Sequence, residues 1–254
     1  MGEHAEVDYR VLWTSSLDDT FRNDFIYCEN VVFNGNMSQD LFEKKYIKNI
    51  YGPSVLVVAY LKGQPVGADA LWRNDINGEK AYQSADTCVL PAARGKGIFM
   101  GMVFHKLEKV EGQGTVYGFP NVNSSHGFLK SGWHLVDERY TTVLLSASSM
   151  SQIDPIQIDC DYAKWWLKDN CDFYSLKKQG KWWLVAKRKI FLYSIVGELT
   201  NEAAQLFPSV KGFCILLYKS NNKSFYNKKR TPMRVITSPA TEDVRIPTWK
   251  IDSI

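Results

Sequence analysis

The sequence of 254 residues contains no apolar run of the roughly 20 residues that a membrane-spanning helix needs. Its first residues, Met-Gly-Glu-His-Ala-Glu-Val-Asp, are polar and acidic, which argues against a secretory signal peptide at this end. The Ser or Thr that N-myristoylation expects at the sixth position is also missing, because Glu6 stands there. These absences predict a cytoplasmic protein without a membrane span.

Cysteine is scarce and its spacing is irregular. The five cysteines are odd in number and widely separated, and no two of them form a C-x-x-C pair. This pattern fits neither a disulfide framework nor a zinc site, because both rely on paired, closely spaced cysteines. We therefore expect reduced, mostly buried thiols and no metal.

Neither sign of charge dominates the sequence. The net charge is +4, and charged residues make up 23% of the chain, so composition alone does not indicate a nucleic-acid partner. The densest cationic cluster, Lys223 with residues 228–230, is interpreted as a solvated loop. Apolar residues amount to 45%, which is enough for the core of an ordinary globular protein.

Hydrophobic periodicity predicts a regular series of elements in the first half of the chain. A helix over 17–32 is expected, capped by Ser15 or Ser16, and a second helix begins after Ser38. Further along, the pattern predicts strands and helices in alternation: strands 54–60, 66–72 and 81–89, a helix to 110, a strand 115–120, a helix 123–130 and a strand 141–145. An antiparallel meander that leads into a strand–helix–strand crossover predicts an α/β (α+β) fold. Its sheet is mixed and mostly antiparallel, and helices flank it.

The polar segment 146–155 ends at a proline and is interpreted as a linker, which divides the chain into domains 1–145 and 146–254. In the smaller C-terminal α/β domain, a short helix precedes a hairpin that turns at Gln179-Gly180. Expected elements there are strands 173–176, 181–186 and 190–196, a helix near 202–207, and strands 213–218 and 233–236. A helix followed by a hairpin occurs in both halves, so the second half resembles a degenerate repeat of the first.

Arg94-Gly95-Lys96-Gly97 stands where a predicted strand becomes a helix. One interpretation is a tight turn, in which the glycines supply positive φ and the cations are solvated. The other is an anion site, because backbone N–H groups at a helix N-terminus are unpaired and carry partial positive charge. Neither G-x-x-x-x-G-K-[ST] nor G-x-G-x-x-G is present, which excludes the two common phosphate-loop families.

The segment from Val89 to Phe99, Val-Leu-Pro-Ala-Ala-Arg-Gly-Lys-Gly-Ile-Phe, resembles the cofactor motif of the GNAT superfamily of acyl-CoA-dependent acyltransferases, V-x-P-x-x-[QR]-x-x-G-x-[GA]. Phe99 departs from the final Gly or Ala. A second motif of that superfamily, N-x-x-A-x-x-L-Y-x-K-x-G-F, is matched by Asn121, Ser124, Gly127, Phe128, Lys130, Gly132 and Trp133. The segment Gly118-Phe119-Pro120 resembles the corresponding segment of a subgroup that is associated with acylation of bacterial surface polysaccharides and amino sugars.

The resemblance implies a binding site for acyl-CoA, either acetyl-CoA or a longer acyl-CoA. The backbone of Thr87, Cys88 and Val89 would pair with the pantetheine arm. The amides from Gly95 to Met100 would hold the diphosphate, with charge from Arg94 and Lys96, and Asn121 and Ser124 would contact the lower arm. By residue, the expected cofactor set is Thr87, Cys88, Val89, Arg94, Gly95, Lys96, Gly97, Ile98, Phe99, Met100, Asn121 and Ser124.

The groups that transfer protons are less clear, because two usual residues are replaced. In many members of the superfamily that this chain resembles, a tyrosine at the position of Phe128 acts as the general acid. In some members, a glutamate at the position of Val116 acts as the general base. Asp86 and His126 are the expected replacement bases. Asp86 could instead pair with a nearby Lys or Arg, and His126 could be a surface histidine.

Three further side chains are weaker candidates for proton transfer. Asp69 is a weaker candidate base, and Tyr82 and Tyr117 are proton donors if they line the site, with core packing favoured for both tyrosines.

The tryptophan pairs 165–166 and 182–183 leave two interpretations open. One ring of Trp182/Trp183 stacks on a sugar or base, or both rings are buried in the core or in a homodimer contact.

The resemblance therefore implies an N-acyltransferase. It would move an acyl group from acyl-CoA to the amine of a small-molecule acceptor, expected to be a nucleotide-linked amino sugar for surface polysaccharide synthesis. Two alternatives remain. The first is a non-catalytic acyl-CoA-binding protein, suggested by Phe128 and Val116. The second is a tRNA-dependent aminoacyl transferase of related fold, against which the modest charge argues.

Overall fold

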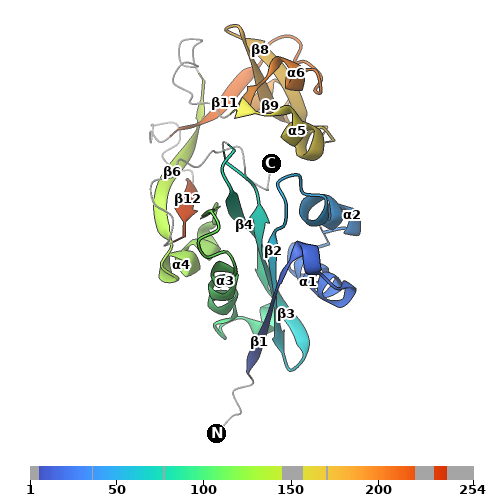
Figure 1. Cartoon of the computed structure of the whole chain (residues 1–254). Coiled ribbons are helices and arrows are strands. Elements are labelled where there is room, and N and C mark those ends of the chain that lie inside the picture. Colours follow the sequence, from blue (N-terminus) through green and yellow to red (C-terminus); the bar gives the residue numbers. More distant parts are fainter. Residues whose placement is uncertain are drawn as a thin grey trace. The chain divides into compact units, whose positions relative to one another are not determined.

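The computed structural model describes residues 6–35, 37–76, 78–144, 157–169, 171–220 and 232–238 (Figure 1). The chain forms two compact units: unit 1 is Met1–Val136 with Arg234–Ile246, and unit 2 is Asp137–Met233 with Pro247–Ile254. This division differs from the expected boundary at residue 145, because β12 (Met233–Thr237), near the end of the chain, pairs with a strand of unit 1. The predicted linker 146–155 and the cationic cluster near Lys228 lie outside the described residues.

The sheet of unit 1 has the strand order β1-β2-β3-β4-β5-β12. Its strands are β1 (Val7–Trp13), β2 (Val55–Leu61), β3 (Gln64–Arg73), β4 (Ala81–Val89) and β5 (Thr115–Gly118), followed by β12. All neighbours are antiparallel except β4 and β5, which run parallel. The predicted fold class, a mixed and mostly antiparallel sheet flanked by helices, is therefore confirmed.

Strand β1 was not predicted from the sequence. Its residues alternate between apolar and polar side chains, and most of them are only half buried because β1 pairs with β2 alone. A seven-residue edge strand that precedes a helix gives a weak sequence signal. β6 (His134–Val143) also begins earlier than the predicted residue 141.

Four helices of unit 1 are arranged on the two faces of this sheet. α1 (Asp19–Phe33) and α2 (Gln39–Phe42) lie on one side in Figure 1, and α3 (Ile98–Lys109) and α4 (Val122–Lys130) lie on the other. The cap of α1 is Asp18 rather than the expected Ser15 or Ser16, which belong to a 3-10 turn before the helix. The expected cap of α2 is confirmed, because the Leu41 N–H donates to Ser38 Oγ at 3.1 Å. After α2 the chain continues as a π-helical turn, Glu43–Ile47.

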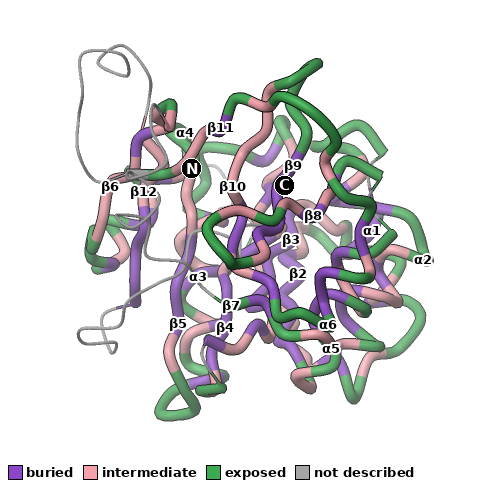
Figure 2. The backbone as a smooth tube through the Cα atoms, turned by 90° about the horizontal axis from the view of Figure 1, so that it is seen from above, coloured by how far each residue is buried: buried purple, intermediate pink, exposed green. Residues whose placement is uncertain are grey.

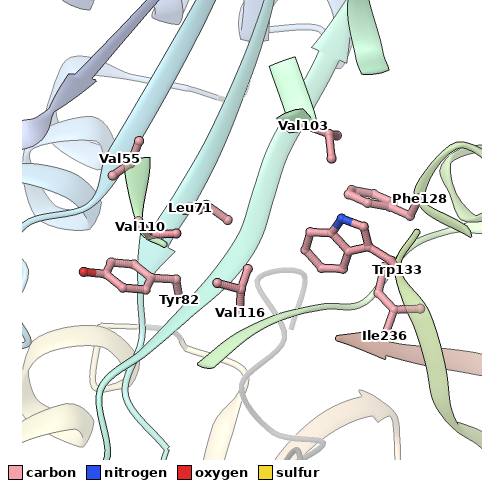
Figure 3. Close-up of a cluster of buried hydrophobic side chains, with 9 residues drawn as sticks. All are labelled: Val55, Leu71, Tyr82, Val103, Val110, Val116, Phe128, Trp133 and Ile236. Atoms are coloured by element: carbon pink, nitrogen blue, oxygen red, sulfur yellow. The ribbon is translucent and has the colours of Figure 1, made fainter. Parts of the chain in front are cut away.

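Unit 1 has buried apolar side chains on both faces of its sheet: Phe25, Phe42 and Tyr46 pack together on the α1–α2 side, and a second cluster lies between the sheet and the α3–α4 layer. Figure 3 shows part of it, with Val55, Leu71, Tyr82, Val103, Val110, Val116, Phe128, Trp133 and Ile236 packed together. In Figure 2 the traces of β2 and β3 are mostly in the colour of buried residues. Val116 and Phe128, which replace the usual base and acid, are both core residues.

Unit 2 is built around a second sheet. Residues Tyr140 to Val143 of β6 pair with β11 (Ile215–Ser220), and β11 runs parallel to β10 (Leu192–Leu199). β10, β9 (Lys181–Lys189) and β8 (Phe173–Lys178) form an antiparallel meander, and β7 (Gln157–Ile158) pairs with β10. Its short helices are α5 (Cys160–Tyr162), continued by a π-helical turn Ala163–Leu167, and α6 (Asn201–Ala204).

The two halves share a topology, as the sequence indicated. Each has a capped helical turn that becomes π-helical, then a three-stranded meander, a helix and a parallel strand. Their first hairpins even share a turn geometry: φ is 53° and 73° at Lys62-Gly63, and 52° and 76° at Gln179-Gly180. The halves differ after the third strand of the meander. In unit 2 that strand leads through Thr200 into the four-residue α6, so the glycine loop belongs to unit 1 alone.

The five cysteines are all free. Only Cys28 and Cys88 are buried, whereas Cys160 and Cys214 are partly exposed and Cys171 is exposed. The expectation of mostly buried thiols is therefore wrong for unit 2, which holds all three accessible cysteines.

Candidate functional site

The glycine loop forms an uncapped helix N-terminus. Gly95 and Gly97 have φ of 78° and 77°, as the sequence predicted, and Gly97 is the N-cap of α3 without any side-chain cap. The first recorded bond of the helix runs from the Gly101 N–H to the Gly97 carbonyl. Among the described residues, the N–H groups from Gly95 to Met100 therefore have no recorded acceptor. A Cβ at either glycine would meet nothing within 4 Å, so the space above the loop is open.

Two cations accompany these donors. Lys96 is exposed at the crest of the loop, and it adds positive charge beside the positive end of the helix dipole. Arg94 is also exposed, but its Nε donates to the Val89 carbonyl at 3.1 Å. The Arg94 side chain thus ties the loop to the end of β4, and it occupies one of the backbone acceptors that the resemblance assigned to pantetheine.

The edge of β4 opens next to this loop. β4 pairs with β5 only from Ala81 to Ser84, since β5 ends at Gly118. The remaining residues of β4, which include Thr87, Cys88 and Val89, have no strand on that side in the described part of the chain. Cys88 and Val89 still pair with β3 on the other side. The result is a short stretch of strand with one free edge, as the sequence motif implied.

A two-against-one bulge interrupts β4 at Asp86. Between the pairs Ala68–Cys88 and Ala70–Ala85, β3 has only Asp69, whereas β4 has both Asp86 and Thr87. Asp86 has φ of 49°, a left-handed conformation that Asp tolerates better than most residues. The extra residue changes which face each following side chain of β4 points to. The Asp86 and Thr87 side chains therefore point to opposite faces of the sheet.

On the α1–α2 face, Asp86 is bound by two side chains of the π-helical turn. Lys45 Nζ lies 3.0 Å from both carboxylate oxygens, and the Tyr46 hydroxyl donates to Oδ2. Lys45 is buried and also lies over the Trp72 ring. The pairing of Asp86 with a nearby cation, which was one of its two sequence interpretations, is therefore present.

A buried glutamate on α1 joins this cluster. Glu29 is 4% exposed, and within the described part of the chain its Oε1 has no hydrogen-bond partner. Burial raises the Glu29 pKa to about 8. The Asp86 charge raises it as well, whereas a hydrogen bond with Cys88 and the Lys45 charge oppose the shift and the Asp69 charge adds to it. Sequence reasoning missed Glu29. The signal was present, because Glu29 continues the spacing of Phe21 and Phe25 along the apolar face of the helix.

On the α3 face, Asp69 and Lys106 form a fully buried ion pair. Lys106 Nζ lies 2.6 Å from Asp69 Oδ1, and both side chains are 0% exposed. Thr87 Oγ1 donates to the same oxygen at 2.7 Å, and Lys106 donates to Ser84 Oγ at 2.8 Å. Burial raises the Asp69 pKa and lowers the Lys106 pKa, while their mutual attraction opposes both shifts. The pair ties α3 to β3 and β4.

Phe99, the departure from the first motif, packs toward α4. Its ring lies 5.1 Å from the Phe128 ring in an edge-to-face arrangement, and Phe128 contacts Trp133 in the same way at 4.9 Å. A Cβ built on Gly127 would come within 2.6 Å of the Phe99 ring. Gly127 stands at the leucine position of the second motif. A large residue at 99 and a small one at 127 therefore compensate each other.

The second motif begins α4. Asn121 is its N-cap, and its Oδ1 accepts from the Asn123 and Ser124 N–H groups at 2.9 Å each. Ser124 Oγ also donates to this oxygen, so the side-chain Oδ1 of Asn121 accepts three hydrogen bonds from the start of the helix. His126 is exposed on α4, and no contact between it and Asp86 is recorded.

The two candidate tyrosines belong to the core. Tyr117 is fully buried, and its hydroxyl donates to the Asn74 carbonyl at 3.1 Å and contacts Gln83. Tyr82 is also fully buried, and the Arg73 guanidinium lies over its ring. In unit 2, Trp183 is buried in the core while Trp182 is half buried next to Lys177, so the two rings face opposite sides as expected.

No helix in the described ranges has the length and hydropathy to cross a bilayer. In the same ranges, no three His, Cys, Asp or Glu residues come together in a group that could hold a metal ion.

No family model and no curated protein matches this chain. Solved structures do match. A GCN5-related N-acetyltransferase from Anabaena variabilis is 12% identical, with a TM-score of 0.55 over 91% of this chain and 73% of its own. One from Kribbella flavida is 11% identical, with a TM-score of 0.53 over 91% and 71%. Eis1 from Mycobacterium abscessus is 12% identical, with a TM-score of 0.51 over 84% and 65%. At these identities the similarity establishes the fold, which is that of GCN5-related N-acetyltransferases.

Proposed function

We propose that this protein is an acyl-CoA-dependent N-acyltransferase. The observation that supports it most is the pairing of two features in unit 1. One is an uncapped helix N-terminus with open space above its glycines, and the other is a strand edge left free beside it. A diphosphate needs the first feature, and an arm that carries amides needs the second.

Each part of acyl-CoA then has a place on these residues. The N–H groups from Gly95 to Met100 hold the diphosphate, and Lys96 adds charge. The backbone of Thr87 and Cys88 pairs with the pantetheine amides, while the Val89 carbonyl is shared with Arg94. The Asn121 Nδ2 and Ser124 contact the lower arm.

In the reaction, a neutral amine attacks the thioester carbonyl, a C–N bond forms and the C–S bond breaks. The thiolate departs without a protein acid, because Phe128 has no proton to give, and it takes up the proton that the attacking nitrogen loses once the C–N bond has formed. The ammonium must first lose a proton, since an amine of this kind has a pKa of ~8. We assign that proton to Asp86, at the bulge, with His126 as the second candidate. The Asp86 charge contributes to the raised pKa of Glu29, so the two carboxyl groups belong to one electrostatic cluster.

The acceptor we propose is a nucleotide-linked amino sugar, and the protein would be cytoplasmic. Support comes from the Gly118-Phe119-Pro120 motif of unit 1. A non-catalytic acyl-CoA-binding protein is the second candidate. The burial of Val116 and Phe128 in the core favours it. A glutamate at 116 or a tyrosine at 128 would fit only if the surrounding core were repacked.

Thiol release separates the two candidates. The protein is incubated with acetyl-CoA or a longer acyl-CoA and with a panel of amino-sugar nucleotides. Release that depends on an acceptor supports the enzyme, whereas cofactor binding without release supports the binder. Asp86→Asn and His126→Ala should lower turnover with little change in cofactor affinity. His105→Ala, which changes a partly exposed histidine paired with Glu108, is the control. If both variants keep full activity, the proton assignment is wrong.

A further inference from the structure

Three large apolar side chains stand exposed together at one end of the unit 2 sheet. The exposed fractions are 77% for Ile190, 58% for Phe191 and 72% for Phe213. Ile190 and Phe191 make the turn between β9 and β10. The Ile215 N–H donates to the Phe191 carbonyl at 2.7 Å. Phe213 is two residues before Ile215, a span of about 7 Å at most, so it lies close to the turn. We call these three residues the apolar tip. Single exposed apolar residues are common, but a contiguous group indicates an interaction site.

Cations surround the apolar tip. Lys187, Arg188 and Lys189 lead into the turn and are exposed, as is Lys211 on the neighbouring segment. Residues 173–197 contain six Lys or Arg and no Asp or Glu. Arg188 donates to Ser194 Oγ at 3.0 Å, and no ion pair is recorded for the other three cations in the described residues. Within the described residues, the tip therefore combines exposed aromatic and aliphatic groups with three exposed lysines, Lys187, Lys189 and Lys211, for which no ion pair is recorded.

We propose that the apolar tip binds the surface of a membrane that contains anionic lipids. Apolar side chains on a turn can enter the boundary between headgroups and acyl chains, and lysines beside them are attracted by anionic headgroups. A second copy of the chain fits less well, because two tips face to face would bring like charges together. A nucleic acid would use the cations but leave the apolar side chains in water.

The test is co-sedimentation of the full chain with phosphatidylcholine vesicles, with and without phosphatidylglycerol. We expect binding to the anionic vesicles only, weakened by added salt. Changing Lys187, Lys189 and Lys211 to Gln should weaken it about a hundredfold, from about fivefold for each cation near an anionic surface. Phe191→Asn with Phe213→Ser should weaken it ~tenfold or more. Asn suits the φ of 63° at position 191.

Phe104→Asn is the matched control, because Phe104 is 59% exposed on α3 in unit 1 and should not affect vesicle binding. The proposal is overturned if the wild-type chain stays in the supernatant with anionic vesicles, or if the Phe191/Phe213 variant sediments as the wild type does. It is also overturned if the tip variants abolish a dimer or RNA binding and vesicle binding is never seen. Circular dichroism of each variant confirms that it is folded.

Discussion

Glu29→Gln should change how the stability of the protein depends on pH. The Glu29 pKa is about 8 in the folded protein against 4.5 for an ordinary glutamate. Because the folded pKa is the higher one, the protonated side chain contributes stability that is fully present below pH 4.5. That contribution is lost as pH rises toward 8. Glutamine cannot ionise, so the variant lacks this loss.

The size of the effect follows from the two pKa values. Between pH 5 and pH 7 this carboxyl is mostly ionised in the unfolded chain but keeps its proton in the folded protein, so the rise in pH removes roughly 2–3 kcal/mol from the free energy of unfolding. Because Glu29 is only 4% exposed, solvent does not screen this contribution appreciably. Relative to wild type, Glu29→Gln should gain roughly 2–3 kcal/mol over that interval.

Urea denaturation at pH 5, 6 and 7, followed by circular dichroism, measures this difference. Glu111→Gln, an exposed glutamate after the end of α3, controls for the substitution of an amide for a carboxyl. If wild type and Glu29→Gln change in parallel from pH 5 to pH 7, the reasoning about Glu29 is refuted.

Two further predictions concern the packing around the site. Lys106→Met leaves Asp69 buried without its cation and should destabilise the protein by about 3–5 kcal/mol, measured by thermal or urea denaturation. Adding Asp69→Asn should recover part of that stability. A loss below about 1 kcal/mol for Lys106→Met would contradict this expectation. Gly127→Leu places a side chain against the Phe99 ring and should cost about 1–3 kcal/mol. Adding Phe99→Ala should relieve that cost, and purely additive effects would show that the two positions do not compensate.

The sequence predicted the parts of unit 1 that have strong local signals. The strand Ala81–Val89, the positive φ at Gly95 and Gly97, and the Ser38 cap were all read from residue type and spacing. Turn glycines and caps act within a few residues, so a single sequence is enough to find them.

Contacts between distant segments could not be predicted in this way. The binding of Asp86 by Lys45 and Tyr46 depends on a π-helical turn and on a bulge in β4, neither of which has a distinct sequence pattern. The pairing of β12 with β5 joins residues more than a hundred positions apart. The Phe99–Gly127 contact likewise becomes visible only when α3 and α4 are packed together.

The main-chain amides of the glycine loop are the basis of the whole account, and calorimetric titration with coenzyme A tests them directly. Gly97→Ala is compared with Gly112→Ala, since both glycines have positive φ (77° and 67°) and open space around them, but only Gly97 begins α3. The account predicts a clear heat of binding for wild type and Gly112→Ala, and a strongly reduced heat for Gly97→Ala. No heat from the wild-type chain, or equal heats from the two variants, would contradict it.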